Sequence, residues 1–416
     1  MAFARRHAIV LVLAVALVLR LGIVAATPSF APTGDPADYD RHAAALAETG
    51  RYPPTAIAAP GGPTALRPPA YPLALGAVYA VTGARWTAGR VLGALLGALT
   101  VALIMALGTR LLGGRTGRWA GAIAAVFPPL VWLNGSLVAE ALFLPAVLGA
   151  LLCVALASDG RALRWAGGAG ALLGLAILTR SNAALLLLPV LGGLLAVTRS
   201  ARAPAVALAV TVLAVAPWAA RNASAFGELL PFGTQSGYTL AGQYNAAAAT
   251  PDDFRAAWRV PQEVPELAPV FARPGIDEAQ LDAALRERAL AFARDNPDHV
   301  LAALRLNLGR LFDLGPNHTF TTTVSLTEMG VPEGQRGGVR LSLYALLILA
   351  AIGAVVLARR RAGPWWLWLS PLLLLASVVP LLGPPRYRAP LDPFLVLLAA
   401  AAITAWRGRR ERAAVA

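Results

Sequence analysis

Residues 8–26 (AIVLVLAVALVLRLGIVAA) form an apolar run, and residues 34–52 (GDPADYDRHAAALAETGRY) follow it as a polar stretch. The run has the length of a membrane-spanning helix and contains a single charged residue, Arg20. The polar stretch is the most acidic short piece in the first half of the chain. This order predicts a first transmembrane helix followed directly by an acidic segment outside the lipid.

The composition of the whole chain agrees with a membrane protein. The 416 residues are 57% hydrophobic and only 14% charged, with a mean hydropathy of +0.61, whereas about a quarter of a soluble domain is charged. The net charge is +14, and every basic residue is an arginine. The arginines lie in short clusters between apolar runs, which is typical of cytoplasmic loops and does not suggest nucleic acid binding. The single cysteine, Cys153, and four scattered histidines argue against a disulfide framework and against a Cys/His metal site.

The apolar segments predict an all-α polytopic membrane protein with about ten transmembrane helices. The segments lie near 8–26, 87–109, 119–135, 138–157, 165–179, 182–198, 203–220, 340–358, 364–382 and 389–406. Residues 70–82 form a shorter candidate that begins with prolines. If this candidate does not cross, and the N-terminus is cytoplasmic, every short basic loop falls on the cytoplasmic side. We therefore expect 70–82 to be an interfacial or re-entrant helix.

This topology divides the chain into six parts and leaves two long segments outside the membrane. The parts are a first transmembrane helix (1–26), an external loop with juxtamembrane helices and a catalytic acid (27–86), a transmembrane bundle (87–220), a small external helical domain (221–339), C-terminal transmembrane helices (340–406) and a basic cytoplasmic tail (407–416). Within the second external segment, 276–296 is expected to be an amphipathic helix, and 298–314 a helix on the membrane surface.

Residues 34–52 have the pattern of a short capped helix. Asp35 suits the N-cap, Pro36 the first helical position and Gly50 the position after the end. Tyr39 is followed at helical spacing by Ala43 and Leu46, an apolar stripe that is expected to face the bilayer. Capping alone would explain Asp35 and the nearby Asp38, although capping and catalysis are compatible.

An acid followed four residues later by tyrosine, then by Gly-x-Tyr and by a Pro-Pro-x-Tyr-Pro stretch, resembles the GT-C membrane glycosyltransferases. The closer resemblance is to the branch with the protein O-mannosyltransferases and the aminoarabinose transferases of lipid A. The elements here are Asp35, Tyr39, Gly50, Tyr52, RPPAYP (67–72), PPLVWLNGSLVAEALF (128–143), GLAILTR (174–180), APWAARN (216–222) and PRYRAPLDP (385–393). The resemblance runs over nearly the whole chain and is poorest over 230–339.

The resemblance implies transfer of a sugar from a polyprenyl-phosphate-linked donor to a protein, lipid or glycan acceptor. Asp35 would act as the general base or orient the acceptor, and Asp38, three residues along the helix, is the rival that the sequence cannot separate from it. Arg67, before the two prolines, is the first candidate to contact the donor phosphate, and Arg386 and Arg388 are the second.

Three further residues belong to the predicted substrate-binding set. Tyr39 and Tyr71 come from the matching motifs, and Glu140 is an acid near the outer end of the spans. The alternative for Glu140 is a structural ion pair with Arg180 or Arg221. No metal or other cofactor is predicted, although three acids of this set would suffice for a weak oxygen site.

Two other classes of protein fit the same composition. One is a polytopic lipid or sugar transporter or flippase of the cell envelope, and the other is a non-catalytic envelope assembly protein. A flippase is expected to keep polar residues along a path through the membrane, whereas these spans are mostly Ala, Leu, Val and Gly. The preferred interpretation is a multi-pass enzyme of the cytoplasmic membrane with its active site facing outside.

Overall fold

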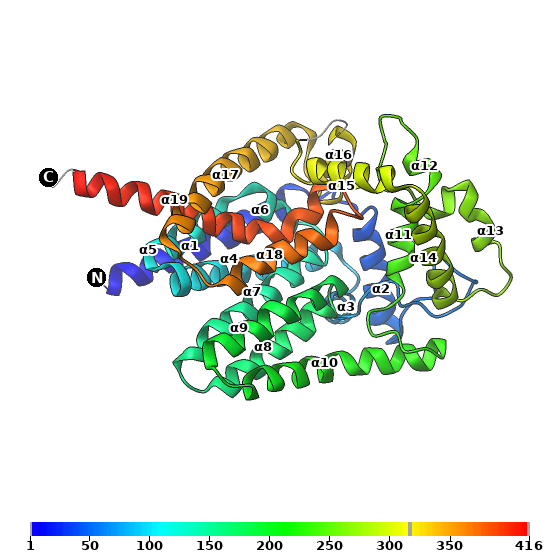
Figure 1. Ribbon diagram of the computed structural model, residues 1–416, viewed down its shortest axis with the longest axis horizontal. Helices are drawn as coiled ribbons and strands as arrows, with labels where there is room; N and C mark the ends of the chain where they lie inside the picture. Colours follow the sequence, from blue (N-terminus) through cyan, green and yellow to red (C-terminus); the bar gives the residue numbers. More distant parts are fainter. Residues whose placement is uncertain (1, 315–317, 414–416) are drawn as a thin grey trace.

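The computed structural model describes residues 2–314 and 318–413, and among these residues it contains helices and no strands (Figure 1). The α-helices are α1 (Ala2–Ala26), α2 (Asp35–Thr49), α3 (Ala70–Thr82), α4 (Trp86–Leu112), α5 (Gly114–Val126), α6 (Pro128–Asn134), α7 (Glu140–Leu156), α8 (Ala162–Ile177), α9 (Leu187–Thr198), α10 (Arg202–Phe226), α11 (Gln235–Gln243), α12 (Ala246–Ala249), α13 (Ala268–Phe271), α14 (Glu278–Asp295), α15 (Pro297–Leu311), α16 (His318–Glu328), α17 (Glu333–Arg360), α18 (Trp365–Val378) and α19 (Asp392–Ala413). The 3₁₀ helices η2 (Ser181–Leu186) and η5 (Pro385–Leu391) lead directly into α9 and α19.

The prediction of an all-α polytopic membrane protein is confirmed. Among the described residues, seven helices are long and apolar enough to cross a bilayer, and three shorter apolar helices accompany them. All ten predicted segments are helical, but 119–135 is divided into α5 and α6. The break follows from the Phe127–Pro128–Pro129 sequence, because a residue before proline is driven out of the helical region, and Phe127 has an extended backbone.

The bundle has two different ends (Figure 1). Both described chain ends lie at one end of the bundle, and α11–α16, which belong to the segment predicted to be external, cap the other end. Helix α2 lies between the bundle and this external segment. Residues 414–416 of the predicted cytoplasmic tail lie outside the described residues. Helix α7 is the most buried of the seven long apolar helices among the described residues, so it lies in the interior of the bundle.

Helix α2 differs from the prediction in two respects. Gly34 occupies the N-cap with φ 60°, and Asp35 is the first helical residue, so its carboxylate does not cap the backbone. The stripe that begins with Tyr39 and Ala43 packs against α3 and not against the bilayer, because Gly76 of α3 lets the two helices approach closely. Gly50 ends the helix in the left-handed conformation, as predicted.

A buried carboxylate helps to join the two segments that are predicted to be external. Glu278, at the start of α14, is 1% exposed. Its Oε1 accepts hydrogen bonds from Thr234, from Thr64 at 3.1 Å and from the Ala65 backbone at 2.7 Å, and its Oε2 accepts one from Thr55 at 2.5 Å. A buried carboxylate is stable only with such partners. The loop that carries Arg67 is therefore fixed to the second external segment.

The predicted helices of the second external segment are both present. Helix α14 begins with a capping box made by Asp277 and Gln280. Helix α15 follows directly and leaves Leu301, Leu304 and Leu308 exposed on one face, consistent with a helix on the membrane surface.

Candidate active site

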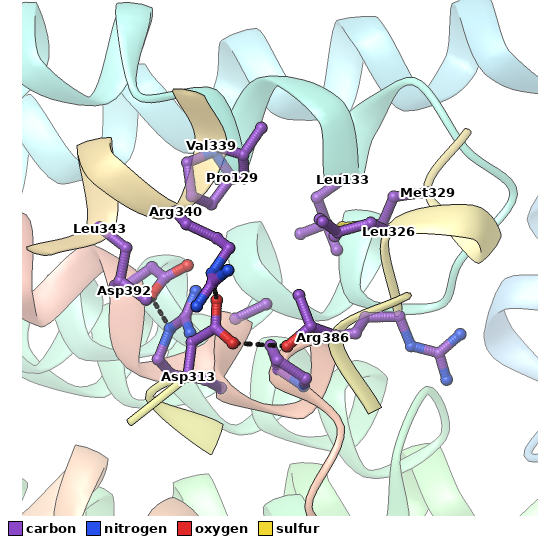
Figure 2. Close-up of a pocket in the computed structure, with 14 residues that line it drawn as sticks. Pro129, Leu133, Asp313, Leu326, Met329, Val339, Arg340, Leu343, Arg386 and Asp392 are labelled. Carbon is purple, nitrogen blue, oxygen red and sulfur yellow. Dashed lines mark hydrogen bonds and ion pairs between the residues drawn. The ribbon is translucent and has the colours of Figure 1, made fainter. Parts of the chain in front are cut away.

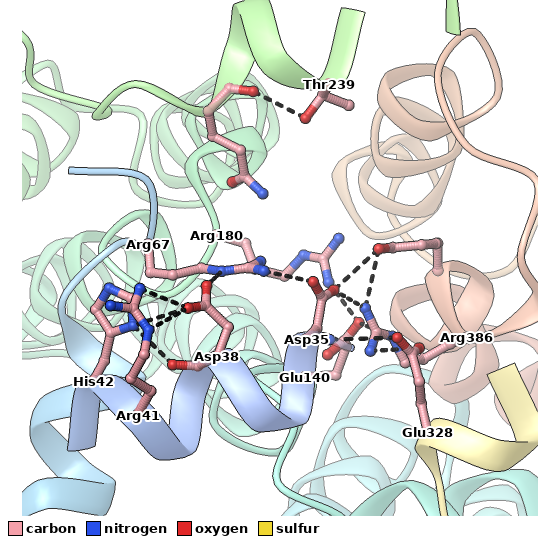
Figure 3. Close-up of polar contacts among 12 residues, drawn as sticks. Asp35, Asp38, Arg41, His42, Arg67, Glu140, Arg180, Thr239, Glu328 and Arg386 are labelled. Atoms are coloured by element: carbon pink, nitrogen blue, oxygen red, sulfur yellow. Dashed lines mark hydrogen bonds and ion pairs between the residues drawn. The ribbon is translucent and has the colours of Figure 1, made fainter. Parts of the chain in front are cut away.

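Asp35 lies where α2 meets the bundle, and two arginines from distant parts of the chain converge on it (Figure 3). Arg67 Nη2 donates to Asp35 Oδ1 at 2.6 Å. On the other side, Arg386 of η5 forms an ion pair with Oδ2, and the Tyr387 hydroxyl donates to the same oxygen at 3.1 Å. The first helical turn therefore aims this carboxylate at a cationic centre.

Asp38 faces a different set of partners. Arg67 Nε donates to Asp38 Oδ2 at 2.6 Å, so Arg67 bridges the two aspartates. The other oxygen of Asp38 accepts from Arg41 Nη2 at 2.9 Å and lies 3.4 Å from Nδ1 of the buried His42. Asp38 is thus held at the edge of the centre, and the structure separates two acids that the sequence could not.

Glu140 and Arg386 are the most deeply buried charged residues of the centre. Glu140 begins α7 and is fully buried, and its Oε1 accepts from Arg180 Nη1 at 2.5 Å. Arg386 Nε lies 3.4 Å from the same oxygen. Of the two arginines that the sequence offered as structural partners of Glu140, Arg180 is therefore the one that pairs with it. Arg221 donates instead to the Thr64 carbonyl at 2.8 Å.

Glu328 completes the centre from the second external segment. Its Oε2 lies 2.8 Å from Arg386 Nη1, and its Oε1 accepts from the Asp35 backbone at 3.4 Å. Burial raises the pKa of Glu328 to about 7, since the nearby Arg386 charge offsets burial only in part and Asp35 adds to the rise. Glu328 therefore titrates near neutral pH.

The two aspartates are shifted in the opposite direction. Burial raises the pKa of Asp35, but the charges of Arg67 and Arg386 outweigh burial and hold the pKa well below its ordinary value. For Asp38, burial is likewise outweighed by a hydrogen bond from His42 and by the charge of Arg67, so its pKa is also low. Asp35 is consequently ionised, and it is a weak base as long as both guanidinium groups hold it.

Two of the predicted tyrosines line the wall behind Arg67. The Tyr39 ring lies under the Arg67 guanidinium, with 5.0 Å from the guanidinium carbon to the ring centroid. Tyr71 packs edge-on against Tyr39, and its hydroxyl is buried without a hydrogen-bond partner among the described residues. Tyr39 thus fixes the orientation of Arg67, and Tyr71 supports Tyr39.

Arg388 is not brought to this centre. Its Nε donates to Asp392 Oδ1 at 3.0 Å, and its Nη1 donates to the Leu311 carbonyl at 2.7 Å. Because η5 turns with about three residues per turn, residues two apart point in different directions. The side chain of Arg388 therefore faces away from Asp35.

A pocket with an apolar wall lies on the far side of Arg386 (Figure 2). It has a volume of about 430 Å³ including its open mouth. Its wall is formed by Leu133, Leu326, Met329, Val339 and Leu343. Arg386 lies at one end of the pocket and the Asp313–Arg340 ion pair at the other. The lining therefore combines an apolar wall with charged side chains of both signs.

Sequence reasoning missed Glu328 and Tyr387 as members of the site, and it considered Arg180 only as a structural partner. Glu328 lies 293 positions from Asp35 in the region where the family resemblance is poorest. No local pattern distinguishes it from other acids of the external segments. Tyr387 lies between the two arginines that were singled out, so its position in PRYRAP was the one available signal.

The described residues contain no group of three or more His, Cys, Asp or Glu side chains with the geometry of a metal site. The carboxylates of the centre are separated by arginines and point at them. The expectation of a metal-independent site thus stays a prediction, which is tested below.

The raised pKa of Glu328 predicts a pH dependence of stability. In the folded protein this carboxyl keeps its proton up to about pH 7, whereas the unfolded chain releases it near 4.5. The folded state binds more protons over this range, so stability falls as the pH rises through it. We expect the melting temperature of the wild type to fall relative to that of Glu328→Gln between pH 5 and pH 8. Parallel melting curves for the two proteins would contradict the assignment.

Comparison with known proteins shows what the chain is similar to. Residues 66–220, less than half of the chain, match the dolichyl-phosphate-mannose-protein mannosyltransferase family. No curated protein matches the chain. The archaeal oligosaccharyltransferase AglB from Archaeoglobus fulgidus, solved with an inhibitory peptide and a dolichol-phosphate, is similar over 97% of this chain and 50% of its own, with 13% identity and a TM-score of 0.53. ArnT from Cupriavidus metallidurans bound to undecaprenyl phosphate is similar over 94% of this chain and 76% of its own, with 16% identity and a TM-score of 0.46.

The fold and the matched segment indicate which class of protein the chain resembles. The all-helical membrane architecture shares the GT-C fold with AglB, although the chain spans about half the length of that protein. The matched mannosyltransferase segment contains α3 and its RPPAYP motif, together with Arg67, Glu140 and Arg180. These findings support a membrane glycosyltransferase of the GT-C type that resembles the mannosyltransferase branch.

Proposed function

We propose that the protein transfers a sugar from a polyprenyl-phosphate-linked donor to a hydroxyl acceptor at the outer face of the cytoplasmic membrane. The observation that carries this proposal is the convergence of Arg67 and Arg386 on Asp35. Guanidinium groups bind phosphate oxygens in a bidentate manner, so the two arginines suit the phosphate of the donor. The solved AglB complex, which contains a dolichol-phosphate, supports the same class of lipid carrier.

The contacts suggest how donor binding would activate the base. When the donor phosphate takes the guanidinium groups of Arg67 and Arg386, Asp35 loses the charges that keep its pKa low. The freed carboxylate then accepts the proton of the acceptor hydroxyl. The hydroxyl oxygen forms a bond to the anomeric carbon, and the bond from that carbon to the phosphate oxygen breaks. Polyprenyl phosphate leaves with the bonding electron pair, and the arginines stabilise its added charge.

In this proposal the pocket next to Arg386 binds the lipid part of the donor. Its wall of Leu133, Leu326 and Met329 is apolar and begins beside the arginine. In this proposal the first isoprene units of the carrier lie against that wall, and the phosphate lies toward Asp35. The long apolar tail then continues into the bilayer.

The direct test uses the purified full-length protein, a labelled polyprenyl-phosphate sugar and a hydroxyl acceptor. Release of polyprenyl phosphate together with label on the acceptor is the expected result. Movement of intact donor across a proteoliposome membrane without bond cleavage would instead indicate a flippase. If no donor is either cleaved or moved, the protein is a non-catalytic assembly protein. Movement without cleavage, or the absence of both, would overturn the proposal.

The outward location has its own test, because Cys153 is the only cysteine and is buried. In a Cys153→Ala background, Glu48→Cys at the exposed end of α2 is expected to react with a membrane-impermeant maleimide on intact cells. Ala201→Cys, in the exposed loop between α9 and α10, is the control that should react only after the cells are opened. The reverse pattern would place Asp35 in the cytoplasm.

Metal removal is expected to leave the transfer rate unchanged. The centre already contains arginines to neutralise the donor phosphate, so a cation is not required for this purpose. Transfer measured with and without excess EDTA checks this point. Loss of transfer that is restored by a divalent cation would show that the prediction is wrong.

A further inference from the structure

A second group of arginines lies in the external segment, apart from the Asp35 centre. Arg310, near the end of α15, is only 2% exposed. Its Nη2 donates to the Arg255 carbonyl at 2.7 Å, while its Nε and Nη1 are buried without a hydrogen-bond partner among the described residues. A buried guanidinium with two unused donor groups is costly unless an anion accepts from it.

The neighbours of Arg310 increase this cost. Arg255 and Arg259 come from the loop that packs over α15, and the Nε atom of each is also buried without a partner in the described part of the chain. Burial lowers the pKa of Arg310, and the positive charge of Arg259 lowers it further. Within residues 2–314 and 318–413, the carboxylate that forms an ion pair with this group is that of Asp252, whose Oδ2 lies 3.6 Å from Arg259 Nη2. Three positive charges therefore share one loosely held acid.

Asn307 supplies an acceptor beside these donors. It lies one turn before Arg310 on the same buried face of α15, and it is fully buried. Its Nδ2 donates to Gln243 and to the Val379 carbonyl, which leaves Oδ1 without a partner among the described residues. The backbone of Gly383 passes close to both Asn307 Oδ1 and Arg310 Cδ. The group thus offers several donors and one acceptor at the outer end of α18.

The group is connected to the active site by one short helix. Gln243, which contacts Asn307, ends α11, and Tyr238 of the same helix lies close enough to Arg67 and Asp38 for their charges to act on the pKa of its hydroxyl. A nine-residue helix is about 13 Å long. The exposed leucines of α15 lie on the opposite face from the arginine group. An anion held here would sit at the membrane surface, a short distance from the reacting carboxylate.

We propose that Arg310, with Arg255 and Arg259, forms a second anion site that binds a phosphate group. Phosphate matches the guanidinium fork better than a carboxylate does because it presents oxygens to several arginines at once. Asn307 Oδ1 would accept a hydrogen bond from a hydroxyl of the bound group. This phosphate group is either a soluble phosphate or part of the acceptor, or it is part of a lipid headgroup of the outer leaflet. The site does not depend on the sugar transfer proposed above.

The test measures binding of labelled inorganic phosphate to the full-length protein in phosphatidylcholine nanodiscs at constant ionic strength. Arg310→Met is expected to weaken one binding component by about tenfold or more, since charge-assisted hydrogen bonds are lost. Arg259→Gln, which changes a partly exposed side chain, should weaken it less and carries the test if Arg310→Met does not fold. Arg273→Gln removes the same charge from an exposed position of the same segment and should have no effect.

Two comparisons separate this site from others. The phosphate-binding component that Arg310→Met weakens should persist in Arg386→Met, which distinguishes it from phosphate bound at the Asp35 centre. It should also be present if the protein transfers no sugar. In nanodiscs that contain phosphatidylglycerol, lower apparent phosphate affinity identifies a lipid headgroup as the ligand, and unchanged affinity identifies a soluble or acceptor-borne phosphate. Equal phosphate binding by wild type, Arg310→Met and Arg259→Gln would overturn the proposal.

Discussion

Replacing Asp35 with asparagine is expected to lower the rate of sugar transfer by about two to four orders of magnitude, the usual contribution of a general base. Asparagine keeps the size of the side chain and its acceptor oxygen for Arg67 or Arg386, but it cannot take a proton. The arginines keep other anionic partners, since Arg67 also contacts Asp38 and Arg386 also contacts Glu328. The variant should therefore fold and insert. Transfer is measured with labelled donor at saturating concentration.

Two variants of the same helix act as controls for Asp35. Asp38→Asn should reduce transfer far less, because Asp38 holds Arg67 and Arg41 at the edge of the centre. Asp40→Asn should leave transfer almost unchanged, because Asp40 accepts from Tyr79 and Trp86 outside the centre. Near-normal transfer by Asp35→Asn would contradict its role as the base, and an equally severe loss only in Asp38→Asn would give that role to Asp38.

Replacing Arg386 should produce the largest combined effect on binding and stability. Its side chain is 1% exposed and contacts Asp35, Glu140 and Glu328. Removing one member of a buried ionic group costs about 3 kcal/mol or more, because the remaining charges lose their partner. Arg386→Met is thus expected to lower the melting temperature clearly and to abolish detectable transfer.

Arg386→Lys separates the two effects. Lysine keeps the positive charge but loses the planar fork that contacts three carboxylates, so the protein should be more stable than Arg386→Met. The KM for the donor should nevertheless rise about tenfold or more. Arg41→Gln, at a half-exposed edge position, is the matched control and should change the donor KM little. A normal donor KM in Arg386→Lys would show that Arg386 does not hold the phosphate.

The fold was largely predictable from the sequence because a helix that crosses the bilayer needs a long apolar segment, which the sequence shows directly. Ten apolar segments became helices, and the capping box of α14 and Gly50 of α2 are placed as their residue types require. The division of 119–135 shows the limit of this criterion. Apolar length does not reveal a break, whereas the local Phe-Pro-Pro sequence does.

The candidate site was predictable only in part, since its contacts join positions far apart in the chain. Asp35 and Asp38 look equivalent on one helix, and they differ in partners from distant positions, since Arg386, 351 positions from Asp35, pairs with Asp35 and not with Asp38. Arg386 and Arg388 look equivalent in PRYRAP, yet Arg388 faces Asp392 and Leu311. The apolar stripe with Tyr39 and Ala43 suggested lipid because a sequence does not tell which apolar partner a helix meets, and here that partner is α3.

The position of the lipid phosphate tests the central claim most directly. A cryo-electron microscopy structure of the protein in a nanodisc with polyprenyl phosphate is expected to show the phosphate in contact with Arg67 and Arg386, with Asp35 released from at least one of them and the first isoprene units beside Leu133 and Leu326. A phosphate bound elsewhere, with both arginines still paired to Asp35, would contradict the account.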